Sequence, residues 1–340
     1  MPLEINQSCI KRISVLIAAV LCAGMFSACT RSDRQPAGPL EKIRIAYAES
    51  SDSALAQIAQ VQGYYLQEGL EAIPQKYPYG KVALQAVLED RADFATVAET
   101  PVMFAVMKGA NIAVIATILT TNRNCVVIAR KDKGILAPSD LKHRKIATTF
   151  GTISEFFMDS FLLAQGISRK DMTVVNLQPD KMQEALATGV VDAVSAFSPY
   201  TVNIRKSLGD REITFFNEDI YTQTFNVVAT REYIRKNPEN VRKVLRALVE
   251  ADEFAKQEPE KAQQITADFC RIDKAVIHAL WESENFNVSL DQVLVLSLED
   301  ESRWAIKNKL VPNAKVPNYL EFIYVDGLAA VQPQAVGLIR

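Results

Sequence analysis

Two segments of this chain repeat one pattern about a hundred positions apart. In each copy, an amphipathic stretch and a turn lead to an aspartate, a short apolar run and a polar end at a proline; the copies are residues 85–101 and 184–199. Asp93 and Asp192 hold the same place in the two copies, 99 positions apart (192 − 93). A repeat of this length predicts two similar α/β lobes. Because ligands preferentially bind in clefts between lobes, the repeat also predicts where a site would lie.

A second match supports the two lobes: the strand-like residues 44–47 correspond to residues 145–148 at an offset of 101. With 49% hydrophobic and 23% charged residues, the chain can build a core in each lobe. The extended apolar runs 124–129 and 225–230 bracket the second copy and are expected to carry the chain across the lobe boundary as a hinge. The expected division is 42–122 with 219–340 for lobe I and 123–218 for lobe II.

Local patterns predict several helix starts. Asn237 followed by Pro238 is typical of a cap and a first helical residue. Ser289 with Gln292 has the spacing of a capping box. Ser51 or Asp52 is expected to cap the helix after the first strand. Asp93 and Asp192 follow tight turns and are expected to fix them by accepting backbone hydrogen bonds.

The N-terminus has the order of a secretory signal. Lys11 and Arg12 precede the apolar run 13–26, and Ser27 and Ala28 stand directly before Cys29. We expect residues 1–28 to be a lipoprotein signal peptide, Cys29 to be lipidated, and residues 29–41 to form a tether. Cleavage near Ala28 without lipidation is the alternative. Either way, the body is expected outside the cytoplasm, on the periplasmic or cell-surface side. If Cys29 is lipidated, the lipid holds the body to a membrane.

Composition excludes several functions. A net charge of −2, without a basic stripe, argues against a nucleic-acid partner. The two histidines, His143 and His278, are far apart, so no metal site is expected, and no cofactor loop or nucleophile elbow is present in the sequence. Cys125 and Cys270 leave two alternatives open, one disulfide or two buried free thiols.

Five segments with this order and spacing resemble a known family. They are residues 62–70 (QGYYLQEGL), 92–101 (ADFATVAETP), 140–147 (DLKHRKIA), 189–193 (GVVDA) and 231–238 (REYIRKNP). The chain is similar to the extracytoplasmic solute-binding proteins of ABC importers, in the NMT1/THI5-like group that serves nitrate, taurine, alkanesulfonates and thiamine-precursor pyrimidines. The resemblance implies a two-lobed periplasmic binding protein fold of type II, in which each lobe is a sheet flanked by helices. It also implies a monomer that captures a small solute and delivers it to the transmembrane subunits of a permease.

Candidate ligand contacts come from the ends of predicted strands, where helices begin and present unpaired N–H groups. An ordinary helix cap is the competing interpretation for residues 151–154, a salt bridge for Glu99, and hinge packing for the two aromatic residues. If Glu99 or Asp52 lined a closing cleft, an amine-bearing or N–H-rich solute would suit it better than an oxyanion. The candidates are Ser50, Ser51, Glu99, Thr100, Thr149, Gly151, Thr152, Ser154, Phe197, Tyr200 and Asn226.

The main hypothesis is therefore a solute receptor of an ABC importer and not an enzyme. Two rivals remain. An exported enzyme on the same scaffold would need paired titratable groups, for which Glu99 with His143 is the pair to test. A ligand-sensing module would bind a solute without moving its lobes. The sequence does not name the solute.

Overall fold

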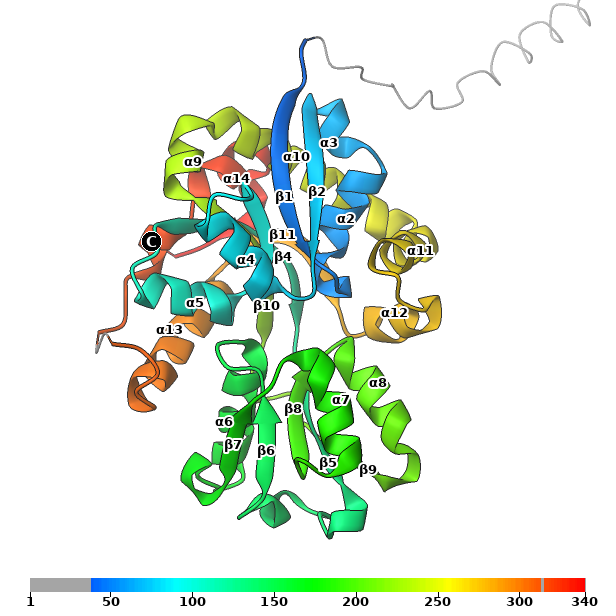
Figure 1. Cartoon of the computed structure of the whole chain (residues 1–340). Coiled ribbons are helices and arrows are strands. Elements are labelled where there is room, and N and C mark those ends of the chain that lie inside the picture. Colours follow the sequence, from blue (N-terminus) through cyan, green and yellow to red (C-terminus); the bar gives the residue numbers. More distant parts are fainter. Residues whose placement is uncertain (1–37, 313–314, 340) are drawn as a thin grey trace, which may run out of the picture. The chain divides into compact units, whose positions relative to one another are not determined.

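The computed structural model describes residues 38–312 and 315–339. The expected signal peptide, Cys29 and most of the tether lie outside the described residues. The described residues belong to one compact unit that begins at Pro36 and holds two β-sheets (Figure 1). No helix within them has the length and apolar character that crossing a membrane requires.

The first sheet has seven strands in the order β12-β11-β4-β10-β3-β1-β2. Strands β1, β2 and β3 run parallel, whereas β10 is antiparallel to both β3 and β4. The central strands are apolar on both faces because helices cover both sides. The strands are β1 (Glu41–Ala48), β2 (Leu70–Tyr77), β3 (Phe94–Ala98), β4 (Ile112–Thr121), β10 (Gln223–Thr230), β11 (Asn285–Asp291) and β12 (Val336–Gly337).

The helices that accompany the first sheet come from both ends of the described chain (Figure 1). The longest, α10, turns the apolar stripe that contains Val241, Leu245 and Leu248 toward α2 and α14. Gly80 opens α4, where a Cβ would come within 2.8 Å of Val97 Cα, so only glycine lets this helix approach β3 so closely. The helices are α2 (Ala54–Val61), α3 (Tyr64–Gln67), α4 (Gly80–Leu88), α5 (Glu99–Met107), α9 (Arg231–Lys236), α10 (Pro238–Gln257), α11 (Pro259–Cys270), α12 (Lys274–Trp281), α13 (Gln292–Lys307) and α14 (Val325–Val331).

The second sheet has five strands in the order β7-β6-β8-β5-β9. Strand β6 is parallel to β7 and β8, while β5 is antiparallel to β8 and β9. The strands are β5 (Cys125–Arg130), β6 (Lys145–Thr148), β7 (Thr173–Asn176), β8 (Ala193–Phe197) and β9 (Glu212–Phe215), and the helices are α6 (Ile153–Ala164), α7 (Pro179–Thr188) and α8 (Tyr200–Leu208). Short 3-10 turns are η1 (Ser51–Ser53), η2 (Lys131–Lys133), η3 (Pro138–Leu141), η4 (Arg169–Asp171), η5 (Gly209–Arg211), η6 (Tyr319–Phe322) and η7 (Pro333–Ala335).

The two sheets have separate hydrophobic cores. The first core draws on residues up to Leu119 and from Phe225 onward, and the two clusters of the second sheet draw on buried residues between Cys125 and Leu208. The chain passes between the sheets at residues 122–124 and again at 216–222. Each of the extended runs expected at the boundary is a strand that begins directly after one of these passages. The mixed α/β class with two helix-flanked sheets is confirmed.

The two repeated aspartates do the same work in the two sheets. Asp93 Oδ2 accepts the backbone N–H of Arg44 at 2.6 Å, and Asp192 Oδ2 accepts that of Lys145 at 2.9 Å. Their own N–H groups return bonds to the carbonyl oxygens of the same partners at 2.9 and 2.8 Å. The prediction that these carboxylates accept backbone hydrogen bonds is confirmed, but the donors belong to neighbouring strands and not to the turns themselves. The two copies of the repeat therefore share the same side-chain contact.

The predicted helix starts had mixed outcomes. Asn237 and Pro238 do open α10 as expected. The capping box at Ser289 is wrong, because Ser289 lies in β11 opposite Thr117 and α13 begins only at Gln292 after Asp291. Because Ser289 is paired with β4 as part of a strand, it does not stand at the N-terminus of a helix, as a capping box requires.

The expected cap at Ser51 or Asp52 is also wrong. Both residues lie within η1, whose N-cap position is Ser50, and α2 follows with Ser53 at its N-cap. Cys125 and Cys270 are buried free thiols, which decides between the two alternatives for them.

Candidate functional site

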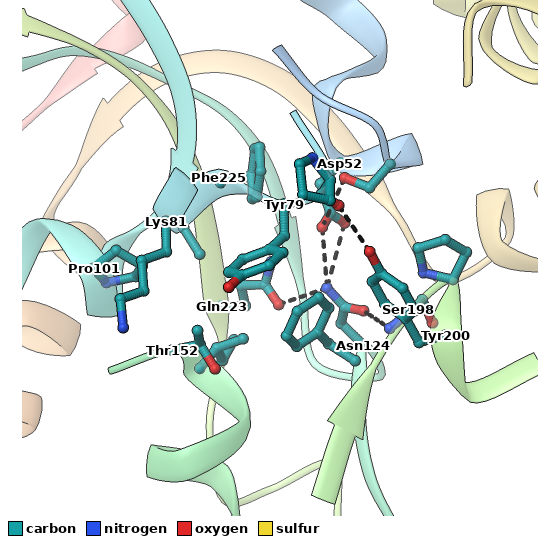
Figure 2. Close-up of a pocket in the computed structure, with 17 residues that line it drawn as sticks. Asp52, Tyr79, Lys81, Pro101, Asn124, Thr152, Ser198, Tyr200, Gln223 and Phe225 are labelled. Atoms are coloured by element: carbon teal, nitrogen blue, oxygen red, sulfur yellow. Dashed lines mark hydrogen bonds between the residues drawn. The ribbon is translucent and has the colours of Figure 1, made fainter. Parts of the chain in front are cut away.

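The candidate site is a pocket lined by residues from the sides of both sheets (Figure 2). On one side, the segments that follow β1, β2 and β3 contribute; on the other, the start of α6 and the segment between β8 and α8. Asn124 ends the first passage between the sheets, and Gln223 directly follows the second as the first residue of β10. The carboxyl ends of strands thus meet helix starts around one cavity, which is the usual location of ligand sites in α/β folds.

One amide side chain joins the polar groups of the pocket. Asn124 Nδ2 donates to Gln223 Oε1 at 2.8 Å and to Asp52 Oδ2 at 3.2 Å, and its Oδ1 accepts the backbone N–H of Ser198 at 2.8 Å (Figure 2). The hydroxyl of Ser50 donates to Asp52 Oδ2 at 3.4 Å. Asn124 therefore links the first sheet's side of the pocket to the segment after β8.

Asp52 is a buried carboxyl group with weak partners. It is 4% exposed, and the hydrogen bonds it accepts from Asn124 and Ser50 are 3.2 to 3.4 Å long. Burial raises the pKa of Asp52 to about 7, although Asn124, Ser50 and Gln223 each act to lower it. Within the described chain, no ion pair with lysine, arginine or histidine compensates its charge.

Gln223, the first residue of β10, is 2% exposed. The bond from Asn124 fixes its Oε1 as an acceptor, so its Nε2 is the remaining donor. Among the described residues this Nε2 has no hydrogen-bond partner. A buried donor without a partner is costly, and it is rare in folded proteins.

Three aromatic rings form one wall of the pocket. The rings of Tyr79 and Phe197 lie 6.2 Å apart at 55°, and those of Phe197 and Tyr200 lie 5.7 Å apart at 86°. The Tyr200 hydroxyl donates to the carbonyl of Pro78 at 3.0 Å, and the Tyr79 hydroxyl donates to Gln178 Oε1 at 2.5 Å. Pro78 and Tyr79 follow β2, whereas Tyr200 and Gln178 lie on the second sheet's side. The two hydrogen bonds therefore connect the two sides of the pocket.

Lys81 supplies a cation at the other end of the pocket from Asp52 (Figure 2). Its Nζ donates to the carbonyl oxygen of Phe150 at 2.7 Å. Burial, with the nearby charge of Lys108, lowers the pKa of Lys81. The two ends of the pocket thus differ in charge.

Three further carboxyl groups lie in the same part of the first lobe; Glu99 and Glu301 are buried and Glu284 is half-buried. Glu99 Oε2 accepts both the N–H and the hydroxyl of Thr224, at 2.9 and 3.2 Å, and burial raises the pKa of Glu99 to about 8. Ser51 donates to Glu284 and Thr100 donates to Glu301, each at 2.5 Å, and burial raises the pKa of both glutamates. A neutral, protonated carboxyl group fits these positions better than a charged one.

The structure distributes the predicted ligand contacts in three groups. Ser50, Thr152, Phe197 and Tyr200 line the pocket. Gly151, with φ +69, lines a neighbouring cavity together with Lys81. The remaining six predicted residues are buried in hydrogen bonds outside the pocket lining: Ser51, Glu99, Thr100, Thr149, Ser154 and Asn226.

Sequence reasoning missed Tyr79, Lys81, Asn124 and Gln223 in the lining, and for Asp52 it favoured a cap over a place in the cleft. Tyr79 and Lys81 stand between β2 and α4, so the strand-end argument used elsewhere would have found them had β2 been recognised. No pattern in the sequence pointed to Asn124 and Gln223. They line the pocket because the two places where the chain passes between the sheets lie side by side, which brings their side chains within hydrogen-bond distance.

Glu99 and His143 do not form the pair that an enzyme would need. His143 lies in the turn before β6, where its N–H donates to the carbonyl of Asp171, and the pocket lies past the other end of that strand. Glu99 is fully buried at the start of α5. No group of three or more potential metal ligands occurs in the described residues.

Residues 50–262 match the family model described as NMT1/THI5 like. The match spans more than half of the 340-residue chain. The chain belongs to this family. The resemblance inferred from the five sequence segments is thus confirmed.

Relatives of this NMT1/THI5-like chain match over most of their length. A proposed binding protein of Brucella abortus is 26% identical over 266 residues, which is 76% of this chain and 81% of the relative. A proposed aliphatic sulfonates-binding protein of Bacillus subtilis is 24% identical over 308 residues, covering 88% of this chain and 91% of the relative.

Solved structures confirm the fold. The periplasmic aliphatic sulphonate-binding protein SsuA from Escherichia coli superposes with a TM-score of 0.70 at 20% identity, covering 84% of this chain and 97% of that one. The alkanesulfonate-binding protein SsuA from Xanthomonas axonopodis, bound to MOPS, gives 0.74 at 18% identity, covering 85% and 100%. The NMT1/THI5-like chain therefore has the periplasmic binding protein fold.

Proposed function

We propose that this chain is the solute-binding component of an ABC importer, which captures a small solute between its two lobes outside the cytoplasm and delivers it to a permease. The observation that supports this most is the pocket itself, because polar and aromatic side chains from both sheets converge on it. A solute bridging the lobes would favour the closed arrangement by the difference in its affinity for the two states. Relatives over most of the chain are named as binding proteins, so a binding protein and not an enzyme is supported.

The body is proposed to be tethered through a lipid on Cys29, with residues up to about 41 as the spacer. The support is the order of charged, apolar and small residues before Cys29. Mass spectrometry of the N-terminal peptide from the membrane fraction tests this: an acylated Cys29 is expected, and a free N-terminus near Ala28 in a soluble fraction would overturn it.

The receptor role predicts ligand-dependent stability. A solute that binds only the folded protein, present at about a hundred times its dissociation constant, raises the free energy of unfolding by roughly 2.7 kcal/mol. Mass spectrometry of small molecules that co-purify with the protein supplies candidates, and thermal melting with each compound, alongside sulfonates, nitrate, carboxylates, amines and nitrogen heterocycles, measures the effect. The absence of both a co-purifying solute and a stabilising compound would contradict the proposal.

A further inference from the structure

A second link between the lobes lies outside the pocket lining, where α13 of the first lobe meets α6 of the second (Figure 1). Trp304 of α13 donates its indole N–H to Asp159 Oδ2 of α6 at 2.9 Å. Its ring lies 5.3 Å from that of Phe156 on α6 and 5.9 Å from that of Phe104 on α5, at angles of 75° and 77°. The indole thus makes edge contacts with one ring from each lobe.

Asp159 is a carboxylate that receives donors from both lobes. It is 9% exposed, and its Oδ2 also accepts Nη1 of Arg169 at 2.8 Å, from the turn η4 that follows α6. Because Arg169 belongs to the same lobe, this ion pair persists when the lobes separate. The bond from Trp304 does not persist, so it is made only while α13 and α6 lie together.

Arg169 also connects this contact to the rim of the pocket. Its Nη2 pairs with Glu155 Oε1 at 2.8 Å, and Glu155 Oε2 accepts the backbone N–H of Gly151 at 2.7 Å. The guanidinium lies 5.4 Å from the centre of the Phe150 ring. Thr152, the next residue after Gly151, lines the pocket. Movement of α6 toward α13 therefore carries this part of the pocket rim with it.

We propose that Trp304 and Asp159 form a latch, a contact outside the pocket that stabilises the closed arrangement of the lobes and so sets part of the affinity for the solute. This inference rests on the proposed receptor function and adds two positioning residues to it. A contact made only in the closed arrangement shifts the open–closed equilibrium by its own free energy, and the apparent affinity follows the closed fraction. A hydrogen bond to a charged acceptor is strong enough to shift that equilibrium by about tenfold.

Single-molecule FRET on the solute-free mature protein measures the ratio of closed to open molecules. Dyes at Leu163→Cys on α6 and Leu296→Cys on α13 report the separation of the two helices, because these side chains are 66% and 51% exposed. Cys125 and Cys270 are buried, which protects them from the dyes, and Cys29→Ser removes the N-terminal thiol. Dialysis into urea and back removes any solute that co-purifies.

Matched variants isolate the latch. Trp304→Phe keeps a ring but removes the indole N–H, and it should lower the closed-to-open ratio by about tenfold. Trp281→Phe should leave the ratio unchanged, because Trp281 packs on Phe286 within the first lobe. Asp159→Asn keeps the shape without the charge and should also lower the ratio. In the double variant of Trp304→Phe and Asp159→Asn, the loss should be smaller than the product of the two single losses, because both weaken the same bond.

The inference is overturned if Trp304→Phe and Trp281→Phe have the same closed-to-open ratio, or if the two single losses multiply fully in the double variant. Circular dichroism melting verifies that each variant is folded, and a lower melting temperature without a change in the ratio would show a role in stability alone. None of these outcomes removes the receptor function, because the pocket lining is intact in every variant. That function fails instead if no solute co-purifies with the wild type and no compound stabilises it.

Discussion

Buried carboxyl groups dominate the chemistry of the first lobe at the residue scale. Asp52, Glu99 and Glu301 are each at most 4% exposed, Glu284 is half-buried, and burial is the largest cause of a raised pKa in all four. One oxygen of each of the three glutamates has no partner among the described residues. Such groups are better accommodated protonated than charged.

The raised pKa values predict how stability depends on pH. The pKa of Glu99 is about 8 in the folded protein, against an ordinary value near 4.5, so the folded state binds more protons than the unfolded state between these limits. The contribution of Glu99 to the free energy of unfolding should therefore be largest below about pH 4.5. It should fall by up to about 1.4 kcal/mol per pH unit as the pH rises toward 8.

Glu99→Gln tests that prediction, because it keeps the shape without the ionisation. Urea unfolding at pH 5.5 and pH 8 should show a smaller loss of stability in Glu99→Gln than in the wild type. Glu232→Gln serves as the control, since Glu232 is exposed and pairs with Lys236 at 2.6 Å. Equal pH slopes in the wild type and Glu99→Gln would show that Glu99 is charged in the folded state.

At the scale of elements, one hydrogen-bonding device recurs in both sheets. Each repeated aspartate ties the turn that follows a helix to a neighbouring strand: Asp93 holds β1 at Arg44, within the strand, and Asp192 holds β6 at its first residue, Lys145. Removing either carboxylate leaves a backbone N–H of that strand without its partner.

Asp93→Ala and Asp192→Ala should therefore each lower the free energy of unfolding by about 1–3 kcal/mol in urea titrations. Asp90→Asn is the matched control: Asp90 is 99% exposed and also pairs with Arg44, and asparagine tolerates its positive φ of 55, so the effect should stay within about 0.5 kcal/mol. An Asp192→Ala effect as small as that of the control would show that the two copies are not equivalent.

The sequence predicted the repeated aspartates and the sheet-and-helix pattern because each has a local signal, but it did not predict the strand partners of the aspartates, which are 49 and 47 positions away. The repeat, the aspartates at its turns and the Asn237 cap could all be found along the chain. Asp52 and Ser289 were misjudged as caps because partners far away in sequence decide their conformation: Asn124 bonds to one, and β4 pairs with the other.

The site was harder to predict for the same reason. Strand-end logic found Ser50, Thr152, Phe197 and Tyr200 in the lining. It could not find Asn124 and Gln223, since they are 99 positions apart and meet only because the chain passes twice between the sheets. The polar end of the pocket is a product of that topology.

At the scale of the whole described unit, two separate cores share a pocket with little free space. The cavity among the lining side chains has a volume of about 30 Å³, well below the roughly 300–1,000 Å³ of typical small-molecule pockets. A ring-sized solute can enter only if the lobes separate or the aromatic wall moves. Bonds across the pocket, such as Tyr200 to Pro78, would then break and re-form around the solute.

Trp304 is placed to report that movement. It lies on α13, beside the first sheet, yet its Nε1 donates to Asp159 Oδ2 on α6 at 2.9 Å and its ring lies 5.3 Å from that of Phe156. Trp281, the other tryptophan, packs on Phe286 of β11 at 4.2 Å, within the first lobe. One indole therefore bridges the lobes and the other does not.

Trp281→Phe leaves Trp304 as the sole tryptophan, and its fluorescence should shift to longer wavelength when solute is removed, because opened lobes expose the indole to water. Adding back the solute that co-purifies should reverse the shift. In the reciprocal Trp304→Phe protein, Trp281 should keep the same spectrum throughout. If both proteins respond alike, or if Trp304 does not respond to a solute that stabilises the fold, the lobes bind without swinging and the sensing-module hypothesis gains over the importer receptor.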